Sequence, residues 1–340
     1  MRKRTWWIWG ILLLAAAGMW VWAVGSRDKG QDEEKDSIRL GILLYRGDDT
    51  FISNVRQALE EQAKLYEQEN QIKVVLNIED AKESQNTQNN QVERMLSLGY
   101  DALCVNIVDR STASTMIDDA IRADVPIVFF NREPVEEDLC RWEKLYYVGA
   151  DAKESAVLQG QIVVDCYKED PSSIDLNGDG KVDYVLLEGE TSHQDSLIRT
   201  EWSIQTLKDG GVPLEKLTGG IANWERSQAS ALMEQWLEQF PGQIELVISN
   251  NDDMALGAID AIERLQVKEK INVVGIDGTP QGVQALERGM LLGTVQSDRT
   301  KYAHGIFTIA AALALDEDPA SKILLEDGRY YWTDQEALVK

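Results

Sequence analysis

One short segment, residues 175–183, carries oxygen-bearing side chains at a regular spacing. Asp175, Asn177, Asp179 and Asp183 occupy its first, third, fifth and ninth positions, and Gly180 occupies the sixth. A hard cation needs several oxygens wrapped around a sharp turn, and this spacing reproduces the first nine positions of a calcium loop. The sequence therefore predicts a calcium site. The alternative is a metal-free turn rich in aspartate, asparagine and glycine.

This segment departs from an EF-hand after its ninth position. An EF-hand supplies a bidentate glutamate at position twelve and continues as a helix, whereas Leu186 stands there, inside an apolar and β-branched run at 182–187 that predicts a strand. One carboxylate ligand must then come from elsewhere in the chain. The loop needs a larger fold to complete it.

Polar side chains also gather just after the predicted strands. In open α/β sheets, ligands bind at the carboxyl ends of strands, so these residues are the natural candidates for a binding site. The set comprises Asp48, Asp49, Phe51, Asn106, Asp109, Asn131, Arg132, His193, Asp195, Arg199, Asn223, Trp224, Asn250, Asn251, Asp252 and Asp277.

The chemistry of this set favours a neutral polyol, with a sugar as the first candidate. Carboxylates, amides and a guanidinium can each pair with two neighbouring hydroxyls, and an aromatic face covers the C–H side of a pyranose ring. Each residue also has a structural alternative. Asp49, Asp195 and Asp252 could cap helices, Asn106 and Asn131 could satisfy loop backbone, and Trp224 could be a core residue.

The elements that must position these residues alternate between short apolar runs and amphipathic segments, which predicts parallel strands with helical crossovers. A first series has strands at 38–44, 72–78, 102–107 and 126–130 and helices near 51–68, 84–98 and 111–123. A second has strands at 145–148, 182–188, 217–221, 244–249, 271–276 and 291–295 and helices near 153–167 and 195–208. We expect two α/β domains, with a helix at 300–315 and a tail from Ser321 that periodicity assigns to neither.

Charge and cysteine content narrow the class of protein. The formal net charge of the 340 residues is −24, which argues against a nucleic-acid partner. The three cysteines form an odd count without CxxC spacing, so neither a disulfide scaffold nor a zinc site is indicated.

The first 25 residues predict export. A basic cluster at 2–4 precedes 21 uncharged residues, 5–25, which suit a membrane-spanning anchor, although 23–25 could serve as a signal-peptide cleavage site. Residues 26–37 read as a polar linker. The remainder is therefore expected outside the cytoplasm, in the cell envelope.

The chain resembles the calcium-containing galactose/glucose-binding members of the type I periplasmic-binding protein family, which serve ABC sugar transport and chemotaxis. The likeness runs from about residue 38 to about 308. It lies in the segments 48–51, 102–109, 128–131, 146–149, 175–183, 250–252 and 293–295.

The resemblance implies an α/β fold of two similar Rossmann-like parallel-sheet domains joined by a three-strand hinge. It places residues 38–128 and 297–325 in the N-terminal lobe and residues 129–296 and 326–340 in the C-terminal lobe. Sugar contacts are implied for Asp49, Phe51, Asn106, His193, Asp195, Arg199, Trp224, Asn251 and Asp277, with Ser297 where the family has asparagine. Calcium ligands are implied for Asp175, Asn177, Asp179, the Lys181 carbonyl, Asp183 and, as the distant carboxylate, Glu245.

The implied function is an extracytoplasmic, monomeric substrate-binding protein that binds D-galactose or D-glucose by domain closure and delivers it to an ABC permease. A membrane-anchored sugar sensor for a chemoreceptor or histidine kinase is the alternative. An enzyme is not expected: His193 with Asp195 could act as acid and base in a hydrolase, but the sequence has no nucleophile elbow. A transcriptional repressor of the same fold is disfavoured by the acidic charge and the leader.

Overall fold

The computed structural model describes residues 35–340. The predicted leader, residues 1–25, and most of the predicted linker lie outside this range. Among residues 35–340, no helix combines the length and the apolar character needed to cross a membrane.

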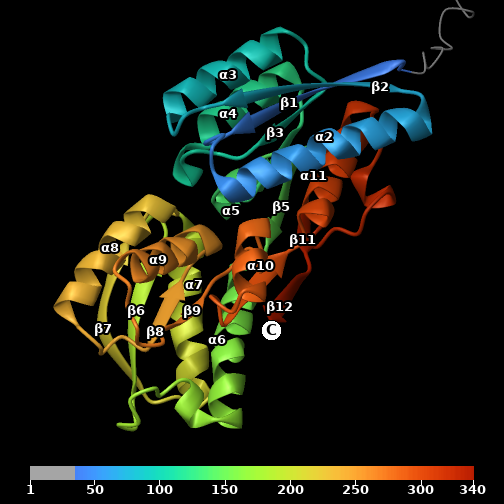
Figure 1. Cartoon of the computed structure of the whole chain (residues 1–340). Helices are drawn as coiled ribbons and strands as arrows, with labels where there is room; N and C mark the ends of the chain where they lie inside the picture. Colours follow the sequence, from blue (N-terminus) through green and yellow to red (C-terminus); the bar gives the residue numbers. More distant parts are fainter. Residues whose placement is uncertain (1–34) are drawn as a thin grey trace, which may run out of the picture. The chain divides into compact units, whose positions relative to one another are not determined.

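The first lobe is built on a six-stranded parallel sheet in the order β11-β5-β4-β3-β1-β2 (Figure 1). Helices α2 and α11 cover one face, and α3 and α4 cover the other. The bounds are β1 Ser37–Leu44, α2 Thr50–Asn70, β2 Lys73–Asp80, α3 Gln85–Ser97, β3 Ala102–Val105, α4 Ser114–Ala123, β4 Ile127–Phe130, α5 Glu136–Leu139, β5 Leu145–Ala150, α11 Arg299–Ala314 and β11 Tyr330–Thr333.

The residue pattern of β1 explains this layering. Leu40, Ile42 and Leu44 project from one face into the core under α2 and α11, whereas Leu43 projects into the core under α3 and α4. Successive strand side chains point to opposite faces, so a strand covered by helices on both sides must be apolar at every position. The continuous apolar run at 40–44 of β1 follows from this requirement.

The second lobe repeats the design in the order β12-β10-β9-β8-β6-β7, with only β12 antiparallel to its neighbour. Helices α8, α9 and α10 pack on one face and α6 and α7 on the other (Figure 1). The bounds are α6 Ala152–Glu169, β6 Val182–Glu188, α7 Gln194–Asp209, β7 Leu214–Ile221, α8 Arg226–Gln239, β8 Leu246–Ser249, α9 Asp252–Arg264, β9 Asn272–Val274, α10 Pro280–Glu287, β10 Gly293–Ser297 and β12 Gln335–Val339. The predicted fold class is confirmed.

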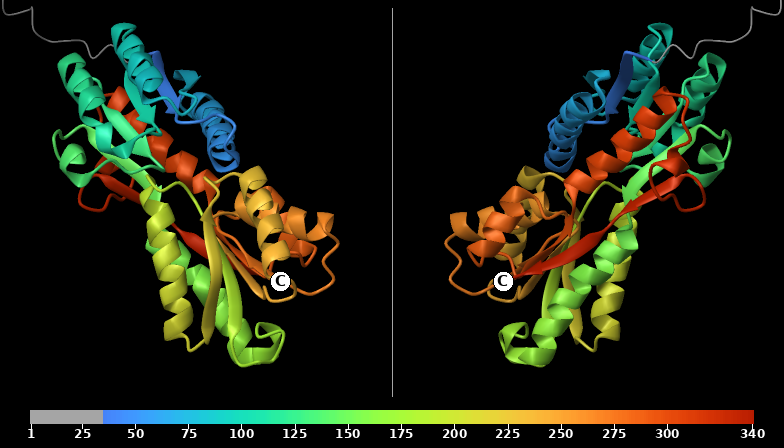
Figure 2. Two further views of the ribbon diagram at one scale, coloured as in Figure 1. Left: turned by 90° about the vertical axis from the view of Figure 1, so that its left-hand side faces the viewer. Right: turned by 90° about the vertical axis from the view of Figure 1, so that its right-hand side faces the viewer.

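The chain passes between the two sheets three times, after β5, after β10 and after β11. Both views in Figure 2 show the last passage, where the red C-terminal segment runs on from one sheet into the other. Strand pairing corrects the expected boundaries. Residues 127–130 and 145–148 pair with each other in the first sheet, and the tail adds β11 to that sheet before β12 joins the second. Periodicity could not assign 145–148, because a parallel strand that is buried on both faces has the same apolar pattern in either sheet.

Asp252, the first residue of α9, connects this helix to the start of α10 and to β10. Its Oδ2 accepts hydrogen bonds from the backbone N–H of Thr279, at 2.7 Å, and from the Thr279 hydroxyl, at 3.1 Å. Its Oδ1 accepts one from the Thr294 hydroxyl at 2.6 Å. A Cβ at Gly275 or Gly282 would lie 2.3 or 2.2 Å from a carboxylate oxygen, so both positions require glycine. The carboxylate thereby fixes the register of α9, α10 and β10.

Replacing Asp252 with alanine should leave three buried donors without their acceptor and lower the free energy of unfolding by about 2–4 kcal/mol. Asp252→Asn should cost less, since an amide can accept from Thr279 and donate to the Thr294 hydroxyl. Urea denaturation of each variant measures the difference. Glu263→Ala, at an exposed position of α9, is the control. A loss in Asp252→Ala no larger than in Glu263→Ala would contradict this role.

Candidate ligand-binding site

A cavity at the carboxyl ends of strands from both sheets contains most of the predicted polar set. The space inside it that can hold the centres of water-sized molecules is about 40 Å³, and the cavity is partly open to solvent. Its lining residues are Tyr45, Asp49, Phe51, Ile52, Asn131, Arg132, His193, Asp195, Arg199, Trp224, Asn251 and Asp277.

The loop after β1 supplies one wall. Asp49 caps α2 by accepting from the backbone N–H of Ile52 at 2.8 Å, and its second oxygen accepts from the Tyr45 hydroxyl at 2.7 Å. Asp49 therefore caps a helix, as the structural alternative proposed, and also lines the cavity. The ring of Phe51 meets that of Tyr302 edge-on, with centroids 5.5 Å apart, which fixes its orientation at the cavity.

The loop after β4 supplies a second group that the resemblance did not include. The Arg132 side chain is buried, and its guanidinium carbon lies 3.7 Å above the centre of the Tyr45 ring. Asn131 precedes it with a φ of 62°, a left-handed conformation that asparagine adopts more readily than most residues. Both residues follow a predicted strand directly, so their position was the available signal. Tyr45 also directly follows a predicted strand, so the same signal was available for it, whereas Ile52, an apolar residue inside the predicted helix 51–68, carried none.

Two predicted sugar residues do not line this cavity. Asn106 is fully buried and donates from Nδ2 to the Phe130 carbonyl and to Asn131 Oδ1, each at 3.1 Å. It therefore lies behind Asn131 and orients it. Ser297 lines a neighbouring cavity that shares Phe51 and Asp277 with the first.

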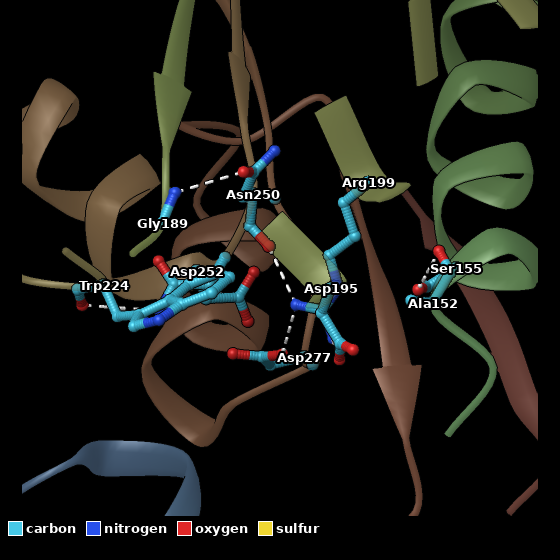
Figure 3. Close-up of polar contacts among 12 residues, drawn as sticks. Ala152, Ser155, Gly189, Asp195, Arg199, Trp224, Asn250, Asp252 and Asp277 are labelled. Atoms are coloured by element: carbon cyan, nitrogen blue, oxygen red, sulfur yellow. Dashed lines mark hydrogen bonds and ion pairs between the residues drawn. The ribbon is translucent and has the colours of Figure 1, made fainter. Parts of the chain in front are cut away.

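Arg199, on α7, is the central cation of the second-lobe wall. Nη1 donates to the Asn250 carbonyl at 2.9 Å and lies 3.4 Å from Asp277 Oδ1, and Nη2 lies 3.6 Å from Asp195 Oδ2 (Figure 3). Its Nε–H is buried and has no hydrogen-bond partner among the described residues.

Burial controls the ionisation of the neighbouring groups. It raises the pKa of Asp195 to about 6 and the pKa of Asp277 well above its usual range, against the opposing effect of Arg199. Burial, helped by Arg132 and Arg199, lowers the pKa of His193 well below its usual value. Because His193 Nδ1 accepts from the Asp195 N–H at 3.2 Å, the neutral ring carries its proton on Nε2.

Trp224 is held by close backbone contacts. A Cβ at Gly189 would lie 2.2 Å from the indole, and the His193 ring meets it edge-on with centroids 5.3 Å apart. Its φ of 66° is unusual for a bulky residue, and Asp277 has a φ of 118°. Such backbone conformations are retained where the surroundings enforce them, often at binding sites. The buried indole Nε1–H also has no partner among the described residues.

Consecutive residues after β8 hold the wall together. Asn250 Oδ1 accepts from the Gly189 N–H at 3.1 Å, drawn in Figure 3, and from the hydroxyls of Ser196 and Thr200. Asn251 caps α9 through the Met254 N–H and donates to the Trp224 carbonyl at 3.4 Å. Of these two neighbours, only Asn251 lines the cavity. Asn250 positions the groups that do.

Hydrogen bonds from backbone N–H groups to carboxylates hold the predicted calcium loop together. Asp175 accepts from the N–H groups of Gly178 and Gly180, at 2.8 and 3.0 Å, which both have positive φ. Glu245 is buried, and its two carboxylate oxygens accept from the N–H groups of Asn177 and Asp183, at 2.9 and 2.8 Å. The distant carboxylate therefore does reach the loop, from just before β8.

The donor chemistry of this loop suits calcium, since it offers carboxylate, amide and carbonyl oxygens without nitrogen or sulfur. In this structure the side chains of the loop accept hydrogen bonds from its backbone. Asn177 and Asp179 each accept from the N–H two residues further on. Within residues 35–340, no three histidine, cysteine, aspartate or glutamate side chains are grouped so that they could hold a metal ion.

Comparison with known proteins identifies the family. The periplasmic binding protein domain matches residues 40–318. The chain belongs to this family. The D-galactose/methyl-galactoside binding periplasmic protein of Haemophilus influenzae is 36% identical over 277 residues, which cover 81% of each chain. A putative rhizopine-binding protein of Rhizobium meliloti is 31% identical over 84% of this chain and 87% of its own.

Solved structures agree with the fold. An ABC transporter solute binding protein from Bacillus halodurans with bound myo-inositol superposes with a TM-score of 0.74 at 27% identity, and the match covers 92% of this chain and 96% of that one. A D-allose-bound periplasmic protein from Actinobacillus succinogenes matches with the same TM-score at 21% identity, over 89% and 97% of the chains. At that identity the likeness concerns the fold alone.

The raised pKa of Asp195 predicts how ligand-free stability changes with pH. Between about pH 4 and pH 6 the folded protein keeps a proton that the unfolded chain releases, so this residue lowers the free energy of unfolding as pH rises through that window. Its share is about 2–3 kcal/mol.

Urea titrations from pH 4 to 7 should therefore give a shallower decline in unfolding free energy for Asp195→Asn than for the unmodified protein. Asp48→Asn, at a side chain that is 85% exposed, should leave the decline unchanged. Parallel pH profiles for Asp195→Asn and the unmodified protein would show that Asp195 titrates normally.

Proposed function

We propose that this protein is an extracytoplasmic substrate-binding protein that binds D-galactose or D-glucose and delivers it to an ABC sugar transporter. The observation that carries the proposal is one cavity to which both lobes contribute buried planar polar groups and aromatic rings. The galactoside-binding relative supports an aldohexose.

The hydrogen-bonding capacity of the cavity supports a polyhydroxyl ligand. Arg132, Arg199 and Trp224 each present a buried N–H without a partner among the described residues, and Asp195 and Asp277 present carboxylate oxygens. A sugar hydroxyl can accept from the first group and donate to the second at the same time. Phe51 and Trp224 supply apolar faces for the ring.

Domain closure follows from the division of the site between lobes. Asp49 and Phe51 follow β1 of the first sheet, whereas Asp195, Arg199 and Asp277 belong to the second lobe. A ligand that contacts both favours the conformation in which the two walls are close together, and a permease can then recognise that conformation. With a leader retained at residues 5–25, the same closure would instead serve a membrane-anchored sensor.

Calorimetry of the full-length chain against a panel of aldohexoses, pentoses and ribose tests the ligand. D-Galactose or D-glucose should bind, and Asp277→Ala should weaken binding by at least about tenfold, because a charge-assisted hydrogen bond contributes about 1.5–3 kcal/mol. Asp48→Ala, outside the cavity, is the control. Tryptophan fluorescence should change on binding, and Trp224→Ala should remove most of that change. Heat with pentoses alone, or with no sugar, would overturn the assignment.

We also propose that the loop at 175–183, completed by Glu245, binds calcium. Asp175, Asn177, Asp179, Asp183 and the Lys181 carbonyl would complete the ligand set, and the ion would stabilise the second lobe.

The melting temperature should be higher with added calcium than with EDTA, by mass action, and Glu245→Ala should abolish that difference. The difference within each variant is the readout, because Glu245→Ala also removes two hydrogen bonds from the loop. Glu238→Ala, exposed on α8, should respond to calcium like the unmodified protein. Equal melting temperatures in calcium and EDTA would identify the loop as a metal-free turn.

A further inference from the structure

An ion pair joins the two lobes beside the cavity. Arg132 follows β4 of the first sheet, Glu190 follows β6 of the second, and Arg132 Nη2 donates to Glu190 Oε1 at 2.8 Å. The two side chains are 5% and 19% exposed, so water screens the pair only weakly. Arg132 lines the cavity, whereas Glu190 does not.

The residues that follow this pair also meet across the lobes. Gln194 Nε2, at the start of α7, donates to Glu133 Oε2 at 3.2 Å. The Glu133 carbonyl accepts from Arg110 Nε at 2.7 Å, within the first lobe. Two consecutive residues after β4 therefore contact the segment between β6 and α7.

Arg132 is positioned by its own lobe, independently of Glu190. Nη1 donates to the Val108 carbonyl at 3.0 Å, and the guanidinium rests on the Tyr45 ring. A guanidinium held in this way loses little conformational freedom when Glu190 arrives. Through Tyr45, whose hydroxyl donates to Asp49, the same side chain supports a carboxylate of the cavity wall.

A second ion pair between the lobes provides a contrast. Arg46, after β1, pairs with Glu225, which directly precedes α8, but it also lies within 4 Å of Asp48, Asp49 and Glu83 of its own lobe. Its charge stays compensated if Glu225 moves away. Arg132, by contrast, pairs with no carboxylate other than Glu190 among the described residues.

We propose that Arg132 and Glu190 form a closure latch, in which Glu190 raises ligand affinity by stabilising the juxtaposed lobes without touching the ligand. The inference rests on the proposed function for its ligand, a hexose. Glu190 is a positioning residue in this scheme. Glu190 should lengthen the time for which the lobes stay together, and it should therefore lower the rate constant of ligand dissociation.

Glu190→Gln keeps the shape of the side chain and removes its charge. In the full-length chain it should raise the Kd for the hexose about fivefold, mainly through faster dissociation, because a charged hydrogen bond becomes a neutral one. Glu225→Gln, the matched control, should change the Kd less than twofold. Equal Kd values and equal dissociation rates for the two variants would overturn the latch.

A ligand-free measurement separates the latch from the proposed function. Spin labels on Cys140, exposed in the first lobe, and on Gln239→Cys, exposed on α8, report the distance between lobes once Cys166→Ser removes the remaining accessible thiol. Glu190→Gln should shift the distance distribution away from that of the unmodified protein, and Glu225→Gln should not. If no sugar binds, the proposed function fails, but the distance between the two spin labels still tests the latch. Identical distance distributions in the unmodified protein and both variants would reject the latch.

Discussion

The second-lobe wall depends on the burial of one guanidinium. Arg199 is almost completely removed from water, yet it is surrounded by two carboxylates and a backbone carbonyl that compensate its charge. Taking any one of these groups out of water alone would be costly. Together they persist only if β8, α7 and the loop after β9 stay in place, so the electrostatics of the cavity and the packing of the lobe stabilise each other.

The packing of the second-lobe wall brings the backbone very close to buried side chains. Gly189 lies against the Trp224 indole, and Gly275 and Gly282 lie against the Asp252 carboxylate, at distances that leave no room for a Cβ. Trp224 and Asp277 adopt positive φ angles. The cavity is thus built from strained but fixed positions, which limits the reorganisation needed when a ligand binds.

Residues that cap helices also line the cavity, because parallel strands of both sheets end at it and the next helices begin there. Asp49 and Asn251 accept from the first turns of α2 and α9 and still face the cavity. Structural and binding roles are therefore not alternatives at these positions. A side chain fixed by a helix terminus is already oriented for a ligand.

The sequence alone determined the fold class, the alternation of strands and helices, and ten of the twelve residues that line the cavity, since parallel sheets require apolar strands and place the polar residues that follow them at one edge. Only the tertiary structure decided which sheet 145–150 and 330–333 join: the first segment is buried on both faces and would have the same apolar pattern in either sheet, and the second is a short, partly buried edge strand. It also placed Asn106 behind Asn131 and brought Tyr45 and Ile52 into the wall. Those positions depend on contacts between residues as far apart as Tyr45 and Arg132, or Arg132 and Glu190, and no local pattern encodes such pairs.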